Sequence, residues 1–348
     1  MAFATAASPS KQQKETSVQW MWQADADPWS SSSVQKGDWF NYSDIETAII
    51  EDAYQKKEME VLLDNYHINF KHLVQISNNN LNHQRPVKRL VREREEGIRL
   101  RESRFLSEPI IPSQPFMEPG PSFFDSLESH FNIPPFEPLD DAFIPVLAES
   151  AAEGLITEGK QVGRQKEGEW MAEQLLNVID GTEQEIWEVC THLYTMESFL
   201  YKKMNEIMRL MGDKQHAQLV QTKALTFGPF AYILEKFNHS RTGLLTVYRG
   251  AQLSDDMIEQ YRKITGTNEI RTFPAYTSTS RSREKAEQFG NVLFEIQIES
   301  DGLDIAKHSA YPDEEEVLLQ RDFGFHIRQC AFDSVKKKWI IHLACLYW

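Results

Sequence analysis

Three short polar motifs in the C-terminal half of the chain carry side chains that could take part in chemistry. They are residues 247–250 (Val-Tyr-Arg-Gly), 275–280 (Ala-Tyr-Thr-Ser-Thr-Ser) and 312–319 (Pro-Asp-Glu-Glu-Glu-Val-Leu-Leu). An arginine can hold a phosphate through two parallel hydrogen bonds, and carboxylates can stabilise a developing cation. Taken singly, each motif is more typical of an ordinary structural feature than of a site. The Arg-Gly pair suits a solvated turn, the serine motif a strand end, and the acidic motif a solvated surface. Their order and setting must therefore carry any functional prediction.

The two glutamates Glu314 and Glu316 lead directly into the apolar run 317–319. Alternation along a strand would place both carboxylates on one face, with Glu315 on the opposite face. Ionised carboxylates beside a buried strand need a partner, and a cationic substrate or transition state would supply one. This pattern predicts a site for cationic chemistry.

The order Arg, Ser-Thr-Ser, Glu-x-Glu resembles the pattern of arginine-specific mono-ADP-ribosyltransferases, a group that includes vertebrate ecto-enzymes and clostridial toxins. Further matching segments are 273–276 (Phe-Pro-Ala-Tyr), 286–290 (Ala-Glu-Gln-Phe-Gly) and 311–312 (Tyr-Pro). The similarity covers about residues 193–346. It implies a domain with N-terminal helices and two packed sheets, NAD as the substrate, no metal, and arginine side chains of proteins as acceptors.

The resemblance also implies roles for the central residues. Glu316 matches the glutamate that stabilises the oxocarbenium-like ribose cation, as carboxylates do in glycoside chemistry. Glu314 matches the glutamate that orients the incoming guanidinium, which suits the planar fork of arginine. Arg249 matches the arginine that holds an NAD phosphate. Gly250 would let the backbone approach the nicotinamide amide, and Ser278 matches the serine that supports NAD and the catalytic glutamate.

Two aromatic residues extend the implied site. Phe289 falls where the family stacks a ring on nicotinamide, and Tyr311 matches the aromatic of the loop that meets the target protein. For both, ordinary packing in a core or a loop is the alternative.

The leading hypothesis is transfer of one ADP-ribose from NAD to protein arginine, with release of nicotinamide. Two alternatives remain. The first is an NAD glycohydrolase, which Glu314 disfavours because only an arginine acceptor needs that residue. The second is a non-catalytic scaffold that binds ADP-ribose, which the complete set of Arg249, Ser278 and Glu316 disfavours. The sequence does not separate NAD from NADP.

The N-terminal part resembles the WWE domain over about residues 17–94. The resemblance rests on residues 20–22 (Trp-Met-Trp), 39–42 (Trp-Phe-Asn-Tyr), 45–46, 53–54 and 66–75, followed by Arg85 and Arg89. Some members bind poly-ADP-ribose, which makes ADP-ribosylated proteins possible partners.

The positions that contact the ligand in such readers correspond here to Trp39, Tyr66, Gln75 and Arg85. An aromatic ring offers a stacking face and an arginine a phosphate contact. Met21 stands where proven readers carry an aromatic residue. The alternative is an interaction module whose tryptophans fill its core.

Local patterns predict the elements that position these residues. Ser43 and Glu46 form a capping box before a helix over about 44–57, and residues 61–63, 68–70 and 87–91 suit short strands. Apolar periodicity predicts helices over 193–211 and 221–237. Strands are expected over 244–248, 291–298 and 339–347, the last two with strict alternation. Helices followed by strands indicate an α+β class.

Composition divides the chain of 348 residues into four parts. Residues 1–16 look disordered, 17–104 form the WWE domain, 105–165 form a linker, and 166–348 form the catalytic domain. Nine of the fifteen prolines lie between residues 109 and 145, so we expect no helices there. The same stretch holds six phenylalanines, more than a spacer needs, so parts of it should dock on a domain or a partner.

Charge and cysteine content narrow the functional classes. The formal net charge of −15 argues against direct nucleic-acid binding, which depends on cationic neutralisation of phosphates. Three scattered cysteines form neither a disulfide framework nor a zinc motif. No signal peptide or membrane span is recognisable, so we expect an intracellular protein of the cytoplasm or nucleus without a membrane partner.

Overall fold

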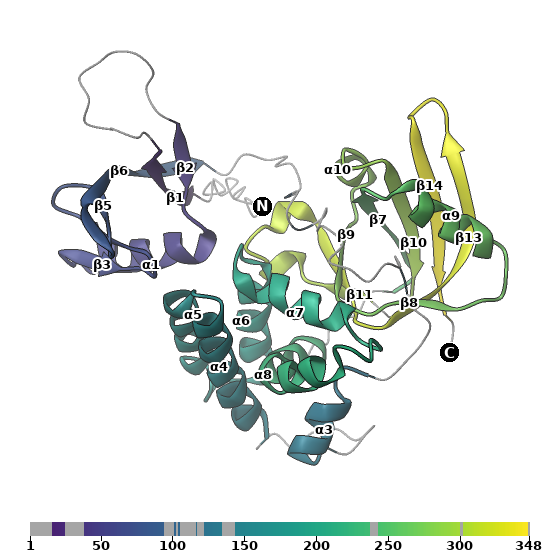
Figure 1. The fold of residues 1–348 in the computed structure, drawn as a ribbon, viewed down its shortest axis with the longest axis horizontal. Coiled ribbons are helices and arrows are strands. Elements are labelled where there is room, and N and C mark those ends of the chain that lie inside the picture. The colour runs from purple at the N-terminus through teal and green to yellow at the C-terminus, as the bar shows by residue number, and fades with distance from the viewer. Residues whose placement is uncertain are drawn as a thin grey trace, which may run out of the picture. The chain divides into compact units, whose positions relative to one another are not determined.

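The computed structural model describes residues 16–24, 38–93, 101, 104, 116, 122–133, 143–236, 243–299 and 302–346. The expected disorder of residues 1–16 lies almost wholly outside this part. The chain divides into two compact units, Met1–Gly97 and Ile98–Trp348. Each is described by itself (Figure 1). Among the described residues, no helix combines the length and apolar character that a bilayer span requires.

The first unit is one helix on a six-stranded antiparallel sheet in the order β2-β1-β6-β5-β4-β3. The strands are β1 (Thr16–Gln23), β2 (Trp39–Asn41), β3 (Glu60–Leu62), β4 (Tyr66–Asn69), β5 (Val74–Ser77) and β6 (Asn80–Glu93). The helix α1 spans Asp44–Gln55. The expected arrangement, one helix with a short-stranded sheet, is confirmed.

The capping box at the start of α1 is also confirmed. The Ser43 hydroxyl accepts from the Glu46 amide, and the Glu46 carboxylate accepts from the Ser43 amide. This exchange satisfies two amides that a helix start leaves without partners. The apolar face of α1 buries Ile45, Ile50 and Ala53 beneath the sheet.

A polar contact ties α1 to the sheet. Glu51 accepts a hydrogen bond of 2.9 Å from the indole nitrogen of the fully buried Trp20 and two, of 2.8 and 2.6 Å, from Arg89. Burial tends to raise the pKa of Glu51, but the hydrogen bonds from Arg89, Gln55 and Trp20 outweigh it and lower the pKa to about 2. The carboxylate therefore stabilises the first unit in its charged form.

We expect Glu51→Gln to destabilise the first unit by roughly 1.5–3 kcal/mol at neutral pH, the range for hydrogen bonds to charged groups. Because the folded pKa lies below the ordinary 4.5, this stabilisation is complete above pH 4.5 and is lost as pH falls toward about 2. Amide hydrogen exchange in β1 and β6 should show it, with the exposed Glu58→Gln as control. Equal protection of the variant and the parent at pH 7 would contradict this role.

The second unit begins with helices and continues with strands (Figure 1), which confirms the α+β class. Within the described residues, the helices that precede its strands include α3 (Asp125–Phe131), α4 (Ile144–Gln161), α5 (Gln165–Leu176), α6 (Glu183–Thr195), α7 (Phe199–Arg209) and α8 (Ala217–Lys236). Two more, α9 (Asp255–Ile264) and α10 (Arg283–Glu287), lie between the strands.

The sheet of the second unit has the order β11-β12-β9-β7-β10-β14-β13-β8. Its strands are β7 (Leu245–Ala251), β8 (Arg271–Phe273), β9 (Thr277–Ser280), β10 (Val292–Ile298), β11 (Gly302–Asp304), β12 (Glu316–Leu319), β13 (Phe323–Asp333) and β14 (Lys338–Cys345). Strands β10 and β14 are parallel, and the other pairs are antiparallel. The two sheets expected for this domain are joined at one residue pair, Tyr248 with Ser280.

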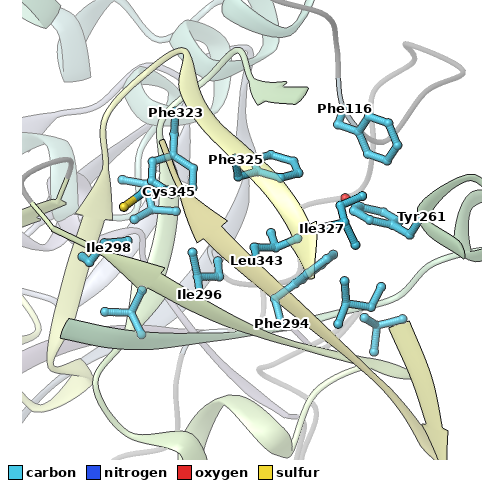
Figure 2. Packing of buried hydrophobic residues seen from close by; sticks show 14 of the residues in the cluster. Phe116, Tyr261, Phe294, Ile296, Ile298, Phe323, Phe325, Ile327, Leu343 and Cys345 are labelled. Atoms are coloured by element: carbon cyan, nitrogen blue, oxygen red, sulfur yellow. The ribbon is translucent and has the colours of Figure 1, made fainter. Parts of the chain in front are cut away.

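One hydrophobic core of this unit is built from side chains of β7, β10, β12, β13 and β14 together with α9 (Figure 2). The alternating residues of β10 predicted to share a face, Val292, Phe294, Ile296 and Ile298, are all buried in it. Phe116 joins them, with its ring centroid 4.6 Å from that of Tyr261. Its burial agrees with the expectation that parts of the phenylalanine-rich stretch dock on a domain.

Two predictions about helices are wrong. The proline-rich stretch was expected to hold no helices, yet α3 lies within it and α4 begins at its end, where Pro145 stands in the first turn and interrupts no hydrogen bond. A single helix was expected over 193–211, but α6 ends at Thr195 and α7 starts at Phe199. Ser198 caps α7 through its side chain, so the apolar periodicity continues across a break in the backbone.

Candidate functional site

The glutamates Glu314 and Glu316 are both fully buried, and the backbone around them is not the continuous strand that the sequence predicted. Glu314 ends a short 3-10 helix (Pro312–Glu314), Glu315 adopts a left-handed conformation with φ of 50°, and β12 starts only at Glu316. The expectation that strand alternation aligns the two carboxylates is therefore wrong. The turn at Glu315 does so instead, and it directs the Glu315 side chain to Lys285 at 2.9 Å.

The serine motif forms β9, which lies antiparallel to β12. Ser278 pairs with Leu318 and Ser280 with Glu316. The Ser280 hydroxyl donates a bond of 2.8 Å to the Glu314 carbonyl, and the Thr279 hydroxyl donates one of 2.5 Å to the Val317 carbonyl. Sequence reasoning singled out Ser278 and missed Ser280, which lies on the same face of β9 two positions later and holds the glutamate turn.

Arg249 lies on β7 and donates a hydrogen bond of 2.6 Å to the Ser278 carbonyl. Burial, together with the charges of Arg209 and Arg104, lowers the pKa of this guanidinium to about 10, although the charge of Glu316 opposes the shift. Arg249 thus stands among other cations as well as near a carboxylate. A bound phosphate would relieve this crowding of positive charge, which is what the sequence predicted for Arg249.

Sequence reasoning also missed Arg209, which ends α7. Burial lowers the pKa of this arginine, while the phenol of Tyr194 and the carboxylate of Glu206 oppose the shift. Only its place in the last turn of an amphipathic helix was visible in the sequence, and an arginine there is commonplace. Its electrostatic influence on Arg249 appears only in the folded chain.

Gly250 follows Arg249 and packs closely against α10. A Cβ at this position would lie 2.4 Å from the Ala286 carbonyl oxygen and 2.8 Å from the Phe289 Cβ. The structure therefore gives Gly250 a packing reason that the sequence did not show. Phe289 is itself buried in a small cluster with Ala286, Leu293 and Ile340.

Two arginines from the segment after the first unit occupy the glutamate site. Arg101 donates two hydrogen bonds of 2.9 Å to the two Glu314 carboxylate oxygens, and its backbone amide adds one of 3.0 Å. Arg104 donates from Nε to both Glu316 oxygens at 3.0 Å. Sequence reasoning placed both within the WWE domain, residues 17–104, and gave them no role at this site. Their partners are more than 200 positions away in the chain.

The end of α6 completes this cationic site. The Thr195 carbonyl accepts a bond of 2.8 Å from Arg101, and the Tyr194 carbonyl accepts one of 3.0 Å from Arg104. The last carbonyls of a helix have no partner within the helix and favour positive charge. The Tyr311 ring centroid lies 3.6 Å from the Arg101 guanidinium carbon. Two carboxylates, a helix terminus and an aromatic ring thus converge on positive charge.

Burial would lower the pKa of both arginines, yet their carboxylate partners raise it. For Arg101 the hydrogen bonds and charge of Glu314 dominate, and for Arg104 the charge of Glu316 does. Both therefore remain charged in the site. Among the described residues, no group of three or more His, Cys, Asp or Glu side chains is arranged to hold a metal ion.

In the first unit, three of the four residues expected to contact ADP-ribose fall on the neighbouring strands β4, β5 and β6, whereas Trp39 lies on β2, which β1 separates from β6. Gln75 and Arg85 are cross-strand partners on β5 and β6, and Tyr66 lies on β4 beside β5. Gln75 is buried and accepts a hydrogen bond of 2.5 Å from the Tyr42 hydroxyl.

Two cationic side chains of this sheet lie over tryptophan rings. The Arg85 guanidinium lies 4.9 Å from the Trp22 ring centroid, and the Lys88 ammonium lies 4.0 Å from that of Trp39. Because Met21 pairs with Lys88 and Trp22 with Val87, these two contacts lie on opposite faces of the sheet. The contact of Arg85 with Trp22 lies on the face of Gln75, and an aromatic ring beside a cation suits a base and a phosphate.

The chain was compared with known proteins. The model of the family "NAD:arginine ADP-ribosyltransferase" matches residues 182–346, and that of the WWE domain matches residues 18–89. A curated protein of Mycobacterium avium, which its name assigns provisionally as an NAD(+)--arginine ADP-ribosyltransferase, is 34% identical over 100 residues. That match covers 28% of this chain and spans only 12% of the relative's length.

Solved structures with similar folds include the ADP-ribosyltransferase HopU1 of Pseudomonas syringae, with a TM-score of 0.42 and 18% identity. It matches over 59% of this chain and 96% of its own. The type III effector XopAI from Xanthomonas axonopodis gives a TM-score of 0.41 and 15% identity, over 64% of this chain and 95% of its own. By its sequence matches, the chain carries an NAD:arginine ADP-ribosyltransferase domain over residues 182–346 behind a WWE domain over residues 18–89.

Proposed function

We propose that the chain transfers one ADP-ribose from NAD to arginine side chains of proteins and releases nicotinamide. The observation that carries this proposal is the fork between Glu314 and a guanidinium, with Tyr311 stacked on it. A buried carboxylate that binds an arginine side chain of this same chain has the shape and charge to bind the arginine of another protein.

Glu316 would act on the ribose. Cleavage of the bond between nicotinamide and ribose leaves positive charge on the ribose ring, and a fixed, fully buried carboxylate stabilises that charge without reorganisation of solvent. The acceptor guanidinium nitrogen then forms the new bond to the ribose carbon. Glu314, which orients that guanidinium, is placed to take the proton released by the nitrogen.

The remaining residues would hold NAD. Arg249, supported by Arg209, offers charge for the diphosphate, and Ser278 supplies the carbonyl that orients Arg249. Gly250 and Phe289 would complete the proposed site at the nicotinamide end of NAD, and Tyr311 would complete it on the side of the acceptor.

One assay tests this function against its alternatives. The purified chain is incubated with NAD and agmatine, a small guanidino acceptor, and both nicotinamide and the agmatine adduct are measured. We expect both products. Nicotinamide without adduct would show a hydrolase, and the absence of both products would contradict catalysis.

We also propose that the WWE domain binds ADP-ribose units of poly-ADP-ribose through Trp39, Tyr66, Gln75 and Arg85. The cross-strand pairing of Gln75 with Arg85 supports this proposal. Calorimetry of the full chain with iso-ADP-ribose should show binding that Arg85→Ala weakens at least about tenfold, since loss of a charge-assisted contact is worth about 1.5–3 kcal/mol. Glu58→Gln, an exposed change, serves as control. No heat at high micromolar ligand would contradict the reader.

A further inference from the structure

Arg101 makes the contacts that the proposed function gives to an acceptor arginine. Its guanidinium forks onto Glu314, donates to the Thr195 carbonyl and lies over Tyr311. A second guanidinium cannot form the same fork while Arg101 holds it. Arg101 therefore fills the acceptor position from within the chain.

Arg104 fills the neighbouring position. Its Nε contacts both oxygens of Glu316, and its guanidinium carbon lies 4.7 and 4.9 Å from the ring centroids of Tyr194 and Tyr201. Arg104 and Glu316 are almost completely buried. The ribose cation would need the negative charge of Glu316, and the Arg104 guanidinium already occupies that carboxylate. Arg104 and productively bound NAD therefore exclude each other.

The fit of Arg104 is incomplete. Its Nη2 is buried without a hydrogen-bond partner among the described residues, although Nε and Nη1 are satisfied. A buried, unsatisfied donor is unfavourable, and an ion pair removed from water gains little over its hydrated partners. These features are consistent with Arg104 being displaced from Glu316 by a ligand that binds the site more favourably.

We propose that Arg101 and Arg104 form an autoinhibitory contact, in which Arg101 occupies the acceptor position as a pseudosubstrate and Arg104 blocks Glu316 against NAD. The inference rests on the proposed function of the two glutamates. Nothing is transferred in the closed state, because the reacting ribose has no place beside Glu316. The enzyme becomes active when Arg101 and Arg104 leave the two carboxylates.

The test compares the full chain with R101A/R104A. If the contact is closed in about nine molecules of ten, it lowers the apparent affinity for NAD about tenfold. We therefore expect R101A/R104A to bind NAD at least about tenfold more tightly in calorimetry and to release nicotinamide correspondingly faster at subsaturating NAD. R101K/R104K keeps both positive charges but loses the guanidinium hydrogen bonds to Glu314 and Glu316, so it should give an intermediate effect. R262A/R328A, two changes at exposed arginines, should match the parent.

A peptide of residues 98–107 adds a test in trans. Added to R101A/R104A, it should inhibit transfer competitively with both agmatine and NAD. The same peptide with alanine at both arginines should not inhibit. This arm keeps the proposal testable if the double variant folds poorly, because the peptide can also be titrated against R101K/R104K.

Four outcomes would overturn the proposal. NAD binding and turnover in R101A/R104A equal to the parent would leave the proposed function intact but remove autoinhibition. Weaker binding would show that the arginines support the site. ADP-ribose found on Arg101 of the parent by mass spectrometry would make Arg101 a substrate. Absence of NAD binding in both proteins would refute the block. If NAD binds more tightly to the variant but neither protein forms product, the block stands and the proposed function fails.

Discussion

Glu316→Gln should abolish release of nicotinamide, with a loss of at least about 100- to 1,000-fold, the range seen when one preorganised group that stabilises transition-state charge is removed. Glutamine keeps the size of the side chain and can still accept one hydrogen bond. It cannot offer negative charge to the ribose cation. The loss should therefore appear in the rate of bond cleavage and affect hydrolysis and transfer alike.

The measurement is nicotinamide release with and without agmatine, in the parent and in the R101A/R104A background. The second background matters because Arg104 contacts Glu316 directly, so that a change at Glu316 alters this contact as well. Glu315→Gln is the matched control, since Glu315 points to Lys285 outside the pair of buried carboxylates. Parent-like nicotinamide release by the Glu316 variant would remove this residue from catalysis.

The second large effect concerns Glu314→Gln, which should separate transfer from hydrolysis. We expect the agmatine adduct to fall at least about 100-fold while release of nicotinamide to water persists. A bidentate carboxylate contact is replaced by an amide that accepts only on one side and opposes the guanidinium on the other. With two charge-assisted hydrogen bonds affected, a loss of about 2.7 kcal/mol, or 100-fold, is within the expected range.

Quantifying adduct and nicotinamide in the same reactions gives the ratio that decides this prediction. Glu315→Gln again controls for a change of charge in the same turn. Hydrolysis by water does not need a carboxylate that binds a guanidinium, so the ratio of adduct to nicotinamide should be lower in the Glu314→Gln variant than in the parent. A parallel fall of both products would instead assign Glu314 to the cleavage step or to the folding of the turn.

The sequence predicted the features of the fold that depend on local pattern. The capping box at Ser43 and Glu46, and the apolar face of β10, follow from interactions between residues a few positions apart. The motif order 249, 278, 314 and 316 identified the family of the second domain, since each motif is short and contiguous.

Local pattern failed where the backbone departs from regular geometry. The turn that buries Glu314 beside Glu316 depends on a left-handed residue at Glu315 and on the hydroxyl of Ser280 from another strand. Strand alternation would place the two carboxylates on one face of a regular strand, but the chain forms a turn at Glu315 instead. The break between α6 and α7 escaped for a similar reason, because apolar periodicity records burial and not the continuity of backbone hydrogen bonds.

By itself the sequence predicted two carboxylates beside a buried strand, an arginine that matches the NAD-holding arginine of the family, and an N-terminal domain that resembles the WWE domain. Only the tertiary structure decided which groups these carboxylates meet. Arg101 and Arg104 lie 213 and 212 positions from their partners, and Arg209 on helix α7 affects Arg249 on strand β7. Charges so far apart in sequence leave no periodic signal. They come together because folding buries Glu314 and Glu316, and a buried carboxylate requires the nearest cation that can reach it.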